Sequence, residues 1–368
     1  MAANSRDMSA TKRAAAAAAL GVTLAERPSG MPASQAPAHA SREYERRQVR
    51  IDEYVQFREQ GFLVVRGLIP PEDIEELRAH LDDLVHGRVE VPGLDPAPAD
   101  AGLEEIERRY VRIHMLHWHL PLHERFLLHP RTLDILEALI GPDVIAMQSM
   151  LFLKPPGSQG QGWHQDSYYI PTFPDSLCGA WIAVDRADEE NGCLWMAQGS
   201  QNEPVYPTPD RVGLHHRDSL ERLEVIENPS NVDDVANTLS RVAARYADRT
   251  VSVIADPGDA VFFSGHVLHR SYANQSATRF RRSFVGHYAN ARSYTEWDYG
   301  LATGPANHRH ILARGTTQLP FGQPRFGTPC AALMPEHERA SGGPPLGVMA
   351  DGDMMDSTPM PGAEDRHG

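Results

Sequence analysis

Short β-prone runs, each closed by a turn, occupy the chain from about residue 143 onward. The runs are VIAMQSMLFLK, CGAWIAVD, TVSVIA, AVFF and RSFVGHYA, and Gly, Pro, Asn and Asp separate them. Short strands with this punctuation are typical of an all-β sandwich or barrel. Because helical patterns come earlier in the chain, we expect a mainly β fold in which supporting helices pack on one side of a double-sheet roll.

Two helical patterns and one strand pattern precede this β region. IDEYVQFREQ predicts a helix that buries Ile51, Tyr54 and Val55 and ends at Gly61. FLVV, residues 62–65, predicts a buried strand. PPEDIEELRAHLDDLVHG then predicts a second helix, whose apolar residues recur at helical spacing: Ile74, Leu77, Leu81, Leu84 and Val85.

Composition divides the 368-residue chain into one domain and two tails. Residues 1–41 are rich in Ala, Ser and Pro and are expected to be disordered. Residues 42–312 are long enough to bury a sizeable core as a single domain. Residues 313–368 return to Gly, Pro, Met and Asp and are expected to form a flexible tail. Within the domain, residues 233–249 predict an inserted helix or lid segment.

Charge and cysteine usage restrict the class of protein. The formal net charge is -14, which favours solubility and disfavours binding to nucleic acid or to an anionic membrane. Cys178, Cys193 and Cys330 are too few and too widely spaced for a disulfide framework or a CxxC zinc site. We therefore expect a cytoplasmic protein, a monomer or a weak homodimer, without a membrane span. The Ala-rich segment at 14–19 faintly resembles a signal peptide, but a disordered tail is the preferred interpretation.

The stretch WHQDSYY places His164 two residues before Asp166. Residues i and i+2 of a strand point to the same face, so a strand here would aim an imidazole and a carboxylate at a single ion. By itself the pair is weak evidence for a metal site, because chance produces many such pairs, and an ordinary polar turn beside Trp163 is the simpler interpretation.

A third ligand has to come from a distant segment. PGDAVFFSGHVLHRSYANQS, residues 257–276, offers His266 and His269. Two histidines and one carboxylate form the facial triad of non-haem Fe(II) oxygenases. Such enzymes also need a cation to hold an anionic cosubstrate. RFRRSF supplies three arginines, Arg279, Arg281 and Arg282. Their guanidinium groups could bind a carboxylate, or they could form a solvated basic turn.

Taken together, these segments resemble the phytanoyl-CoA dioxygenase family of Fe(II)- and 2-oxoglutarate-dependent oxygenases over residues 50–290. The matching blocks are YVQFREQGFLVVRGLIPPEDIEELRAHLDDL, MLFLKPPG before WHQD, AWIAVDRADEENGCLWMAQGSQ, PGDAVFFSGHVLHRS, and NQS with RFRRSFVGHYA. The resemblance implies a double-stranded β-helix, that is, a cupin-like jelly roll. It also implies the cofactors Fe(II), 2-oxoglutarate and O2.

The resemblance further implies roles for individual residues. His164, Asp166 and His269 would bind iron, with His269 preferred to His266 for its spacing from the Gly258-Asp259 turn and for the H-x-S-x-x-N pattern. Arg281 would hold the distal carboxylate of 2-oxoglutarate. The interval from the distal histidine to this arginine is one residue longer than is usual in the family, so Arg279 and Arg282 remain open. The other positions expected to line the cosubstrate pocket are Gln165, Trp181, Met150 and Ser271.

The expected reaction is hydroxylation of an unactivated C–H bond in a small organic molecule, with release of succinate and CO2. The substrate class stays open among natural products, amino-acid-like compounds and acyl compounds, and desaturation or ring formation is also possible. The carboxylate of Asp166 argues against halogenation, because halogenating relatives have a small residue there. The alternatives are a non-catalytic jelly roll that binds metal and 2-oxoglutarate, and a cupin-type metalloenzyme that does not use 2-oxoglutarate.

A cluster of histidines in HMLHWHLPLH has no assigned role. It could form a second metal site or a wall of the substrate pocket, or its members could serve packing and surface roles. Its histidines are His114, His117, His119 and His123.

Overall fold

The computed structural model describes residues 42–91, 94, 100–102, 105, 109–206, 238–295, 310–317, 322–324 and 348–349. The tail expected at 1–41 lies outside these residues. The chain divides into two compact units, Met1–Tyr44 and Glu45–Gly368, and the sheets and helices that the structure describes belong to the second unit.

A large sheet forms the centre of this unit, with the strand order β1-β8-β5-β10-β3-β11-β12; β2 pairs with β3, and β13 pairs with β2. Among the described strands, β11 and β12 pair in parallel and the other pairings are antiparallel. The strands of this sheet are β1 (Phe62–Val65), β2 (Arg112–His114), β3 (Val144–Phe152), β5 (Cys178–Ala183), β8 (Ala260–Ser264), β10 (Ser283–Asn290), β11 (His310–Arg314), β12 (Gly322–Pro324) and β13 (Val348–Met349).

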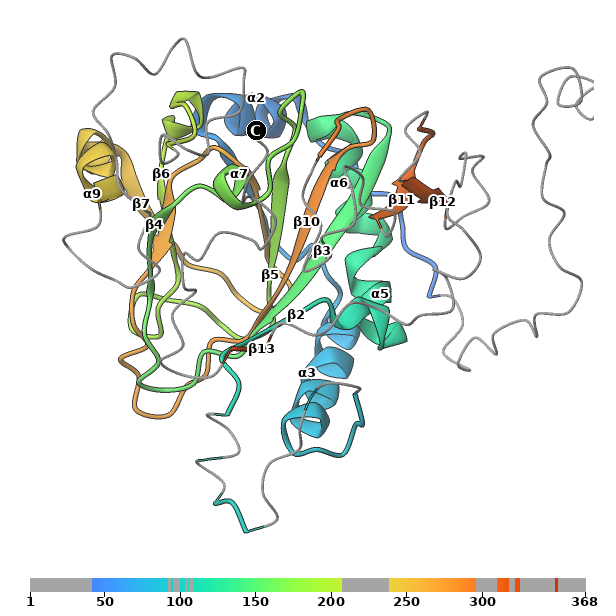
Figure 1. The fold of residues 1–368 in the computed structure, drawn as a ribbon, viewed down its shortest axis with the longest axis vertical. Helices are drawn as coiled ribbons and strands as arrows, with labels where there is room; N and C mark the ends of the chain where they lie inside the picture. The colour runs from blue at the N-terminus through green and yellow to red at the C-terminus, as the bar shows by residue number, and fades with distance from the viewer. Residues whose placement is uncertain are drawn as a thin grey trace, which may run out of the picture. The chain divides into compact units, whose positions relative to one another are not determined.

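A smaller antiparallel sheet, with the order β4-β9-β6-β7, faces the large one (Figure 1). Its strands are β4 (Gln161–His164), β6 (Leu194–Ala197), β7 (Thr250–Val253) and β9 (His269–Ser271). One apolar cluster joins both sheets, with Phe62, Trp181 and Val285 from the large sheet and Met196 and Val253 from the small one. Two facing sheets with a shared core are the double-sheet roll predicted from the strand pattern.

Helices cover the face of the large sheet that points away from the small sheet (Figure 1). They are α3 (Pro71–Val85), α5 (Pro121–Leu127) and α6 (Pro130–Ile140), and each begins with a proline, which suits the first helical position. The apolar stripe predicted for α3 is confirmed, because Ile74, Leu77, Leu81 and Leu84 are buried. They join Leu151, Ile182 and Phe284 of the sheet in a second core cluster.

Shorter helical segments lie in the connections between these elements. They are η1 (Leu116–Trp118), α7 (Asp166–Tyr169), η2 (Ser200–Asn202), α9 (Thr238–Ala243) and η4 (Ala244–Arg249). Helical structure predicted at 233–249 is confirmed for residues 238–249, and residues 233–237 lie outside the described part of the chain.

The helix predicted from IDEYVQFREQ forms as α2 (Ile51–Gln60), but the predicted buried face is wrong. Phe57 and Glu53 are buried instead. Burial of Glu53 is tolerated because its carboxylate accepts hydrogen bonds from the backbone N–H of Arg50 at 2.9 Å and from Nη2 of Arg47 at 2.6 Å. The three residues expected inside are largely exposed: Ile51 at 85%, Tyr54 at 41% and Val55 at 42%.

The predicted domain boundaries at 42 and 312 stay predictions. β11 runs across residue 312 and pairs with β3, and β12 and β13 fall within residues 313–368. In the described part of the chain, no helix is both long and apolar enough to cross a membrane.

Candidate metal centre and cosubstrate pocket

Three buried side chains from two distant parts of the chain converge between the sheets. His164 Nε2 lies 3.7 Å from Asp166 Oδ1, and His269 Nε2 lies 3.6 Å from the same oxygen. The centroids of the two imidazole rings are 4.0 Å apart. Among the residues that the structure describes, this is the one group of His, Cys, Asp and Glu side chains placed to hold a metal ion, with ligand atoms within 4.8 Å of one another. The predicted ligands are thus brought together.

Both imidazoles present the nitrogen that a metal needs. His164 Nδ1 lies 2.8 Å from the carbonyl oxygen of Gly162, and His269 Nδ1 lies 3.0 Å from that of Val267. Because a carbonyl oxygen only accepts hydrogen bonds, Nδ1 carries the proton in each ring and Nε2 keeps its lone pair. Burial, followed by the effect of His269, lowers the pKa of His164 to about 3, which favours the neutral imidazole. Two neutral imidazoles and one carboxylate fit Fe(II).

The second oxygen of Asp166 has a different partner. Its Oδ2 lies 2.9 Å from Nε2 of His287 on β10. Burial alone would raise the pKa of the Asp166 carboxyl, but His269 and the hydrogen bond from His287 outweigh burial and hold that pKa well below its ordinary value. The sequence analysis assigned no role to His287. One signal was present: His287 lies an even number of residues after Arg281, so a continuous strand would point both side chains to the same face.

The strand expected to carry both His164 and Asp166 is shorter than predicted. β4 ends at His164, and the short helix α7 begins at Asp166. The same-face argument is therefore wrong in detail, since Asp166 approaches the histidines from a helical turn. The register of β4 with β9 pairs His164 directly with His269, which brings the two imidazoles together.

His266 lies outside this group. Its Nε2 is 3.2 Å from Asp175 Oδ2, and its Nδ1 is 3.1 Å from the carbonyl oxygen of Glu203. These contacts agree with the preference for His269 as the third candidate ligand.

The structure separates the three candidate arginines by their partners. Arg279 forms ion pairs with Asp188 and Glu190, and Arg282 forms ion pairs with Asp185 and Asp82. Each of these two guanidinium groups therefore already has a carboxylate partner.

Arg281 is buried, and its Nη1 donates to the hydroxyl of Ser283 at 3.0 Å. Its Nε has no hydrogen-bond partner among the described residues. Burial lowers the pKa of Arg281 to about 10, so the group remains a cation at neutral pH. A buried cation with an unused donor is suited to an anionic ligand.

Two other predicted pocket residues, Met150 and Trp181, belong to the core cluster that joins the two sheets. Met150, Val285 and Trp181 form one row across β3, β10 and β5. The guanidinium carbon of Arg281 lies 5.8 Å from the ring centroid of Trp181. On the opposite sheet, the hydroxyl of Ser271 accepts a hydrogen bond from Nζ of Lys154 at 3.2 Å.

Lys154 is a buried residue that the sequence analysis did not single out, although it stands in the MLFLKPPG block. Its ammonium group also contacts the carbonyl oxygens of Gly192 and Tyr272. Burial, together with Arg281, lowers its pKa well below the ordinary value.

The side chain of Gln165 is engaged elsewhere. Its Nε2 donates to the carbonyl oxygens of Pro204 and His266 at 3.1 and 2.9 Å, and its Oε1 accepts from the backbone N–H of Tyr206 at 3.1 Å. This amide ties two loop segments together, and its hydrogen-bonding groups are occupied by the protein itself.

The four clustered histidines diverge. His114 on β2 bonds Gln148, and His117 bonds the hydroxyl of Ser149 at 2.7 Å. His123 is fully buried in α5, with its ring centroid 5.2 Å from that of His80. No second metal group involves them among the described residues.

Comparison with known proteins gives a family for the chain. The family model "Phytanoyl-CoA dioxygenase (PhyH)" matches residues 57–283, more than half of the chain. The peroxisomal phytanoyl-CoA dioxygenase of Rattus norvegicus is 28% identical over 272 residues, 71% of this chain and 70% of the relative. Phytanoyl-CoA dioxygenase domain-containing protein 1 of Danio rerio is 26% identical over 320 residues, 74% of this chain and 98% of the relative.

A solved structure supports the fold. The crystal structure of EctD from S. alaskensis with 2-oxoglutarate and 5-hydroxyectoine aligns with a TM-score of 0.50 at 18% identity, over 71% of this chain and 83% of that chain. This similarity confirms the predicted jelly roll. The family match and the curated relatives establish more than the fold: the chain is a dioxygenase that belongs to the phytanoyl-CoA dioxygenase family of Fe(II)- and 2-oxoglutarate-dependent oxygenases.

Proposed function

We propose that His164, Asp166 and His269 hold Fe(II), that Arg281 anchors 2-oxoglutarate, and that the enzyme hydroxylates an unactivated C–H bond of a small organic molecule. One observation carries the proposal: two Nε2 atoms and one carboxylate oxygen converge in a buried site, and both Nδ1 atoms are engaged by backbone carbonyls. When bound, Fe(II), 2-oxoglutarate and O2 supply the oxidising power, and succinate and CO2 are released.

The side chains around the centre would fix the ligands before the reaction begins. The Gly162 and Val267 carbonyls hold both imidazoles in one tautomer and one orientation. The carboxylate of Asp166 contributes one negative charge. Three protein ligands leave further positions on the ion for small molecules.

Arg281 supports the assignment of the cosubstrate. A carboxylate placed against its guanidinium would meet a cation with an unused donor, between Trp181 and Phe152. Burial strengthens such a charged contact, because little water screens it. The hydroxyl of Ser271, held by Lys154, is a second candidate contact. Met150 and Trp181 would form apolar walls that exclude water.

The proposed substrate is a natural product, an amino-acid-like compound or an acyl compound. The names of the comparison proteins point to different molecules, phytanoyl-CoA for the rat relative and 5-hydroxyectoine for the EctD structure. We also propose that the protein is a cytoplasmic monomer or weak homodimer that binds neither nucleic acid nor membranes. Its net charge of -14 and its three widely spaced cysteines support this proposal.

Succinate release tests the function. The protein with Fe(II), 2-oxoglutarate and O2 would be screened against a panel of the three substrate classes, with His164→Ala as the control. We expect one substrate class to stimulate succinate formation by the wild type. We expect no compound to stimulate it in the His164→Ala variant. A non-catalytic jelly roll would bind 2-oxoglutarate, but no compound would stimulate its turnover. A cupin-type enzyme that does not use 2-oxoglutarate would keep its activity in the Arg281→Ala variant.

A further inference from the structure

The carboxylate of Asp166 divides its two oxygens between different partners. Oδ1 faces Nε2 of His164 at 3.7 Å and Nε2 of His269 at 3.6 Å. Oδ2 lies 2.9 Å from Nε2 of His287. All four side chains are buried, so water competes little for these contacts.

The direction of the hydrogen bond between Asp166 and His287 follows from its acceptor. An ionised carboxylate has no proton to give, so Nε2 of His287 must be the donor. The other ring nitrogen, Nδ1, is buried and has no hydrogen-bond partner among the described residues. Among the described residues, the His287 ring therefore makes its hydrogen bond to Asp166, which is a candidate metal ligand.

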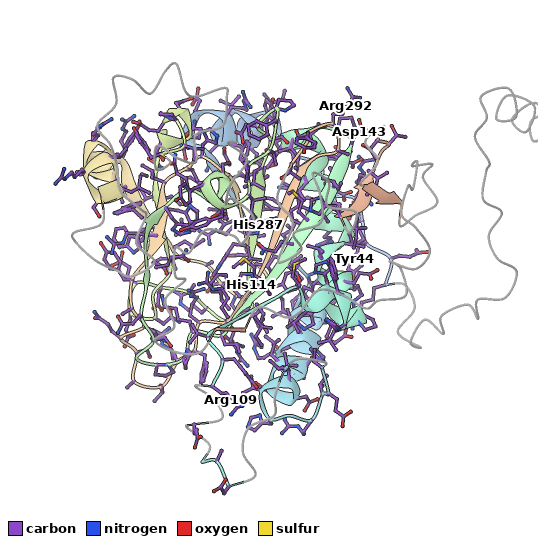
Figure 2. All side chains as sticks on the ribbon, viewed as in Figure 1. Tyr44, Arg109, His114, Asp143, His287 and Arg292 are labelled. Carbon is purple, nitrogen blue, oxygen red and sulfur yellow. The ribbon has the colours of Figure 1, made fainter. Side chains whose placement is uncertain are left out.

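The backbone holds His287 in this direction. β10 lies between β3 and β5, and His287 pairs with Gln148 on one side and Gly179 on the other. The next residue, Tyr288, points to the helix layer, where its hydroxyl donates to the carbonyl oxygen of Leu127 at 2.7 Å. Successive residues of a strand point to opposite faces of the sheet, so His287 and Tyr288 serve different layers. Figure 2 labels His287, whose Nε2 reaches the carboxylate of Asp166 at the start of α7.

We propose that His287 is a positioning residue, whose Nε2–H holds Oδ2 of Asp166 so that Oδ1 alone is presented to the metal. The inference rests on the proposed metal site. Without this donor the carboxylate would be free to turn about its Cβ–Cγ bond and to offer either oxygen or both. A fixed orientation lowers the entropy lost when the metal binds, and groups that orient a ligand in this way typically change metal affinity by about 10- to 100-fold when they are removed.

Three substitutions at one position separate this role from general packing. His287→Leu removes the donor and keeps an apolar side chain of moderate size. His287→Gln places an amide N–H near the position of Nε2, whereas the amide of His287→Asn is too short to reach Oδ2. His123→Gln is the matched control, because His123 is also fully buried but lies in α5, in the helix layer near Phe284.

The measurement is an anaerobic titration of metal-free, full-length protein with Fe(II). Circular dichroism would first confirm that each variant is folded. The dissociation constant for Fe(II) is the primary readout. The position of the visible charge-transfer band after addition of 2-oxoglutarate is the second, because loss of packing elsewhere would not shift it.

We expect wild type and His123→Gln to bind Fe(II) equally, with His287→Leu and His287→Asn weaker by about 10- to 100-fold and a shifted band. His287→Gln should recover most of the affinity. If the Leu variant does not fold, the comparison of Gln with Asn decides. Equal affinity and an unchanged band in the folded Leu or Asn variant would overturn the inference while leaving the metal site intact. Failure of the wild type itself to bind Fe(II) would overturn both the proposed function and the inference.

Discussion

Arg279 donates two hydrogen bonds to the carboxylate of Asp188, from Nη1 at 2.7 Å and from Nη2 at 2.9 Å. Its neighbour two residues on, Arg281, contacts no carboxylate among the described residues and is buried on the inner face of the large sheet. Two cations close in sequence thus have different tasks. Arg279 ties the segment before β10 to the loop at Asp188. Arg281 is the proposed anchor of 2-oxoglutarate.

The first prediction follows from this difference. Arg281→Gln should raise the KM for 2-oxoglutarate by roughly 10- to 100-fold, because a hydrogen bond to a charged group contributes about 1.5–3 kcal/mol. Arg279→Gln should leave that KM unchanged and reduce thermal stability. Steady-state kinetics on both variants check this, and a larger effect at Arg279 would reassign the anchor.

Gln165→Leu should affect folding more than cosubstrate binding. The substitution leaves the carbonyl oxygens of Pro204 and His266 and the N–H of Tyr206 without their side-chain partner. Each unpartnered buried group costs about 1–3 kcal/mol, so the free energy of unfolding should fall clearly. Urea unfolding and the KM for 2-oxoglutarate are the two measurements. A large rise in KM at unchanged stability would show that Gln165 contacts the cosubstrate.

Gly160→Ala should disturb the pairing of β4 with β9. A Cβ added at Gly160 would lie 2.2 Å from the carbonyl oxygen of Ser271, so the backbone would have to shift. The same strand pairing aligns His164 with His269. We therefore expect the free energy of unfolding to fall by about 1–3 kcal/mol and Fe(II) to bind more weakly. Gly102→Ala, where the added Cβ meets nothing within 4 Å, is the control. Identical unfolding midpoints for the two variants would contradict the expectation.

The metal-free protein should lose stability in mild acid. Burial lowers the pKa of His117 and of His310 from 6.5 to about 3. Between these pH values the unfolded chain binds protons that the folded chain does not, so stability is full above pH 6.5 and falls as the pH falls toward 3. Each histidine contributes a slope of up to about 1.4 kcal/mol per pH unit.

His117→Asn tests the sign and the source of this effect. The amide can keep a polar contact with Ser149 but does not take up a proton in this range. Urea unfolding at a series of pH values should show a shallower acid slope for the variant than for the wild type. Parallel slopes would mean that His117 does not contribute.

The sequence predicted α3 because its apolar residues recur at helical spacing. It predicted the strands β1, β3, β5, β7, β8 and β10 because β-prone runs are closed by turn residues. It failed at α2, where burial depends on tertiary partners: Glu53 is buried because Arg47 and the backbone of Arg50 satisfy it. No local pattern carries that information.

For the candidate site, the sequence and the family resemblance named the three residues that converge, but not how they converge. The approach of Asp166 from α7 and the contact of His287 with Oδ2 depend on how a strand ends and how two strands pair. The choice among three arginines also needed their partners, since Asp188 and Asp185 are distant in sequence from the RFRRSF segment.

The most direct test of the account is an anaerobic absorption measurement. Fe(II) and then 2-oxoglutarate would be added to the metal-free protein and to His164→Ala. The account predicts a weak visible charge-transfer band from the metal chelate in the wild type and no band in the variant. A folded wild-type protein that takes up Fe(II) and shows no band with 2-oxoglutarate would contradict the account.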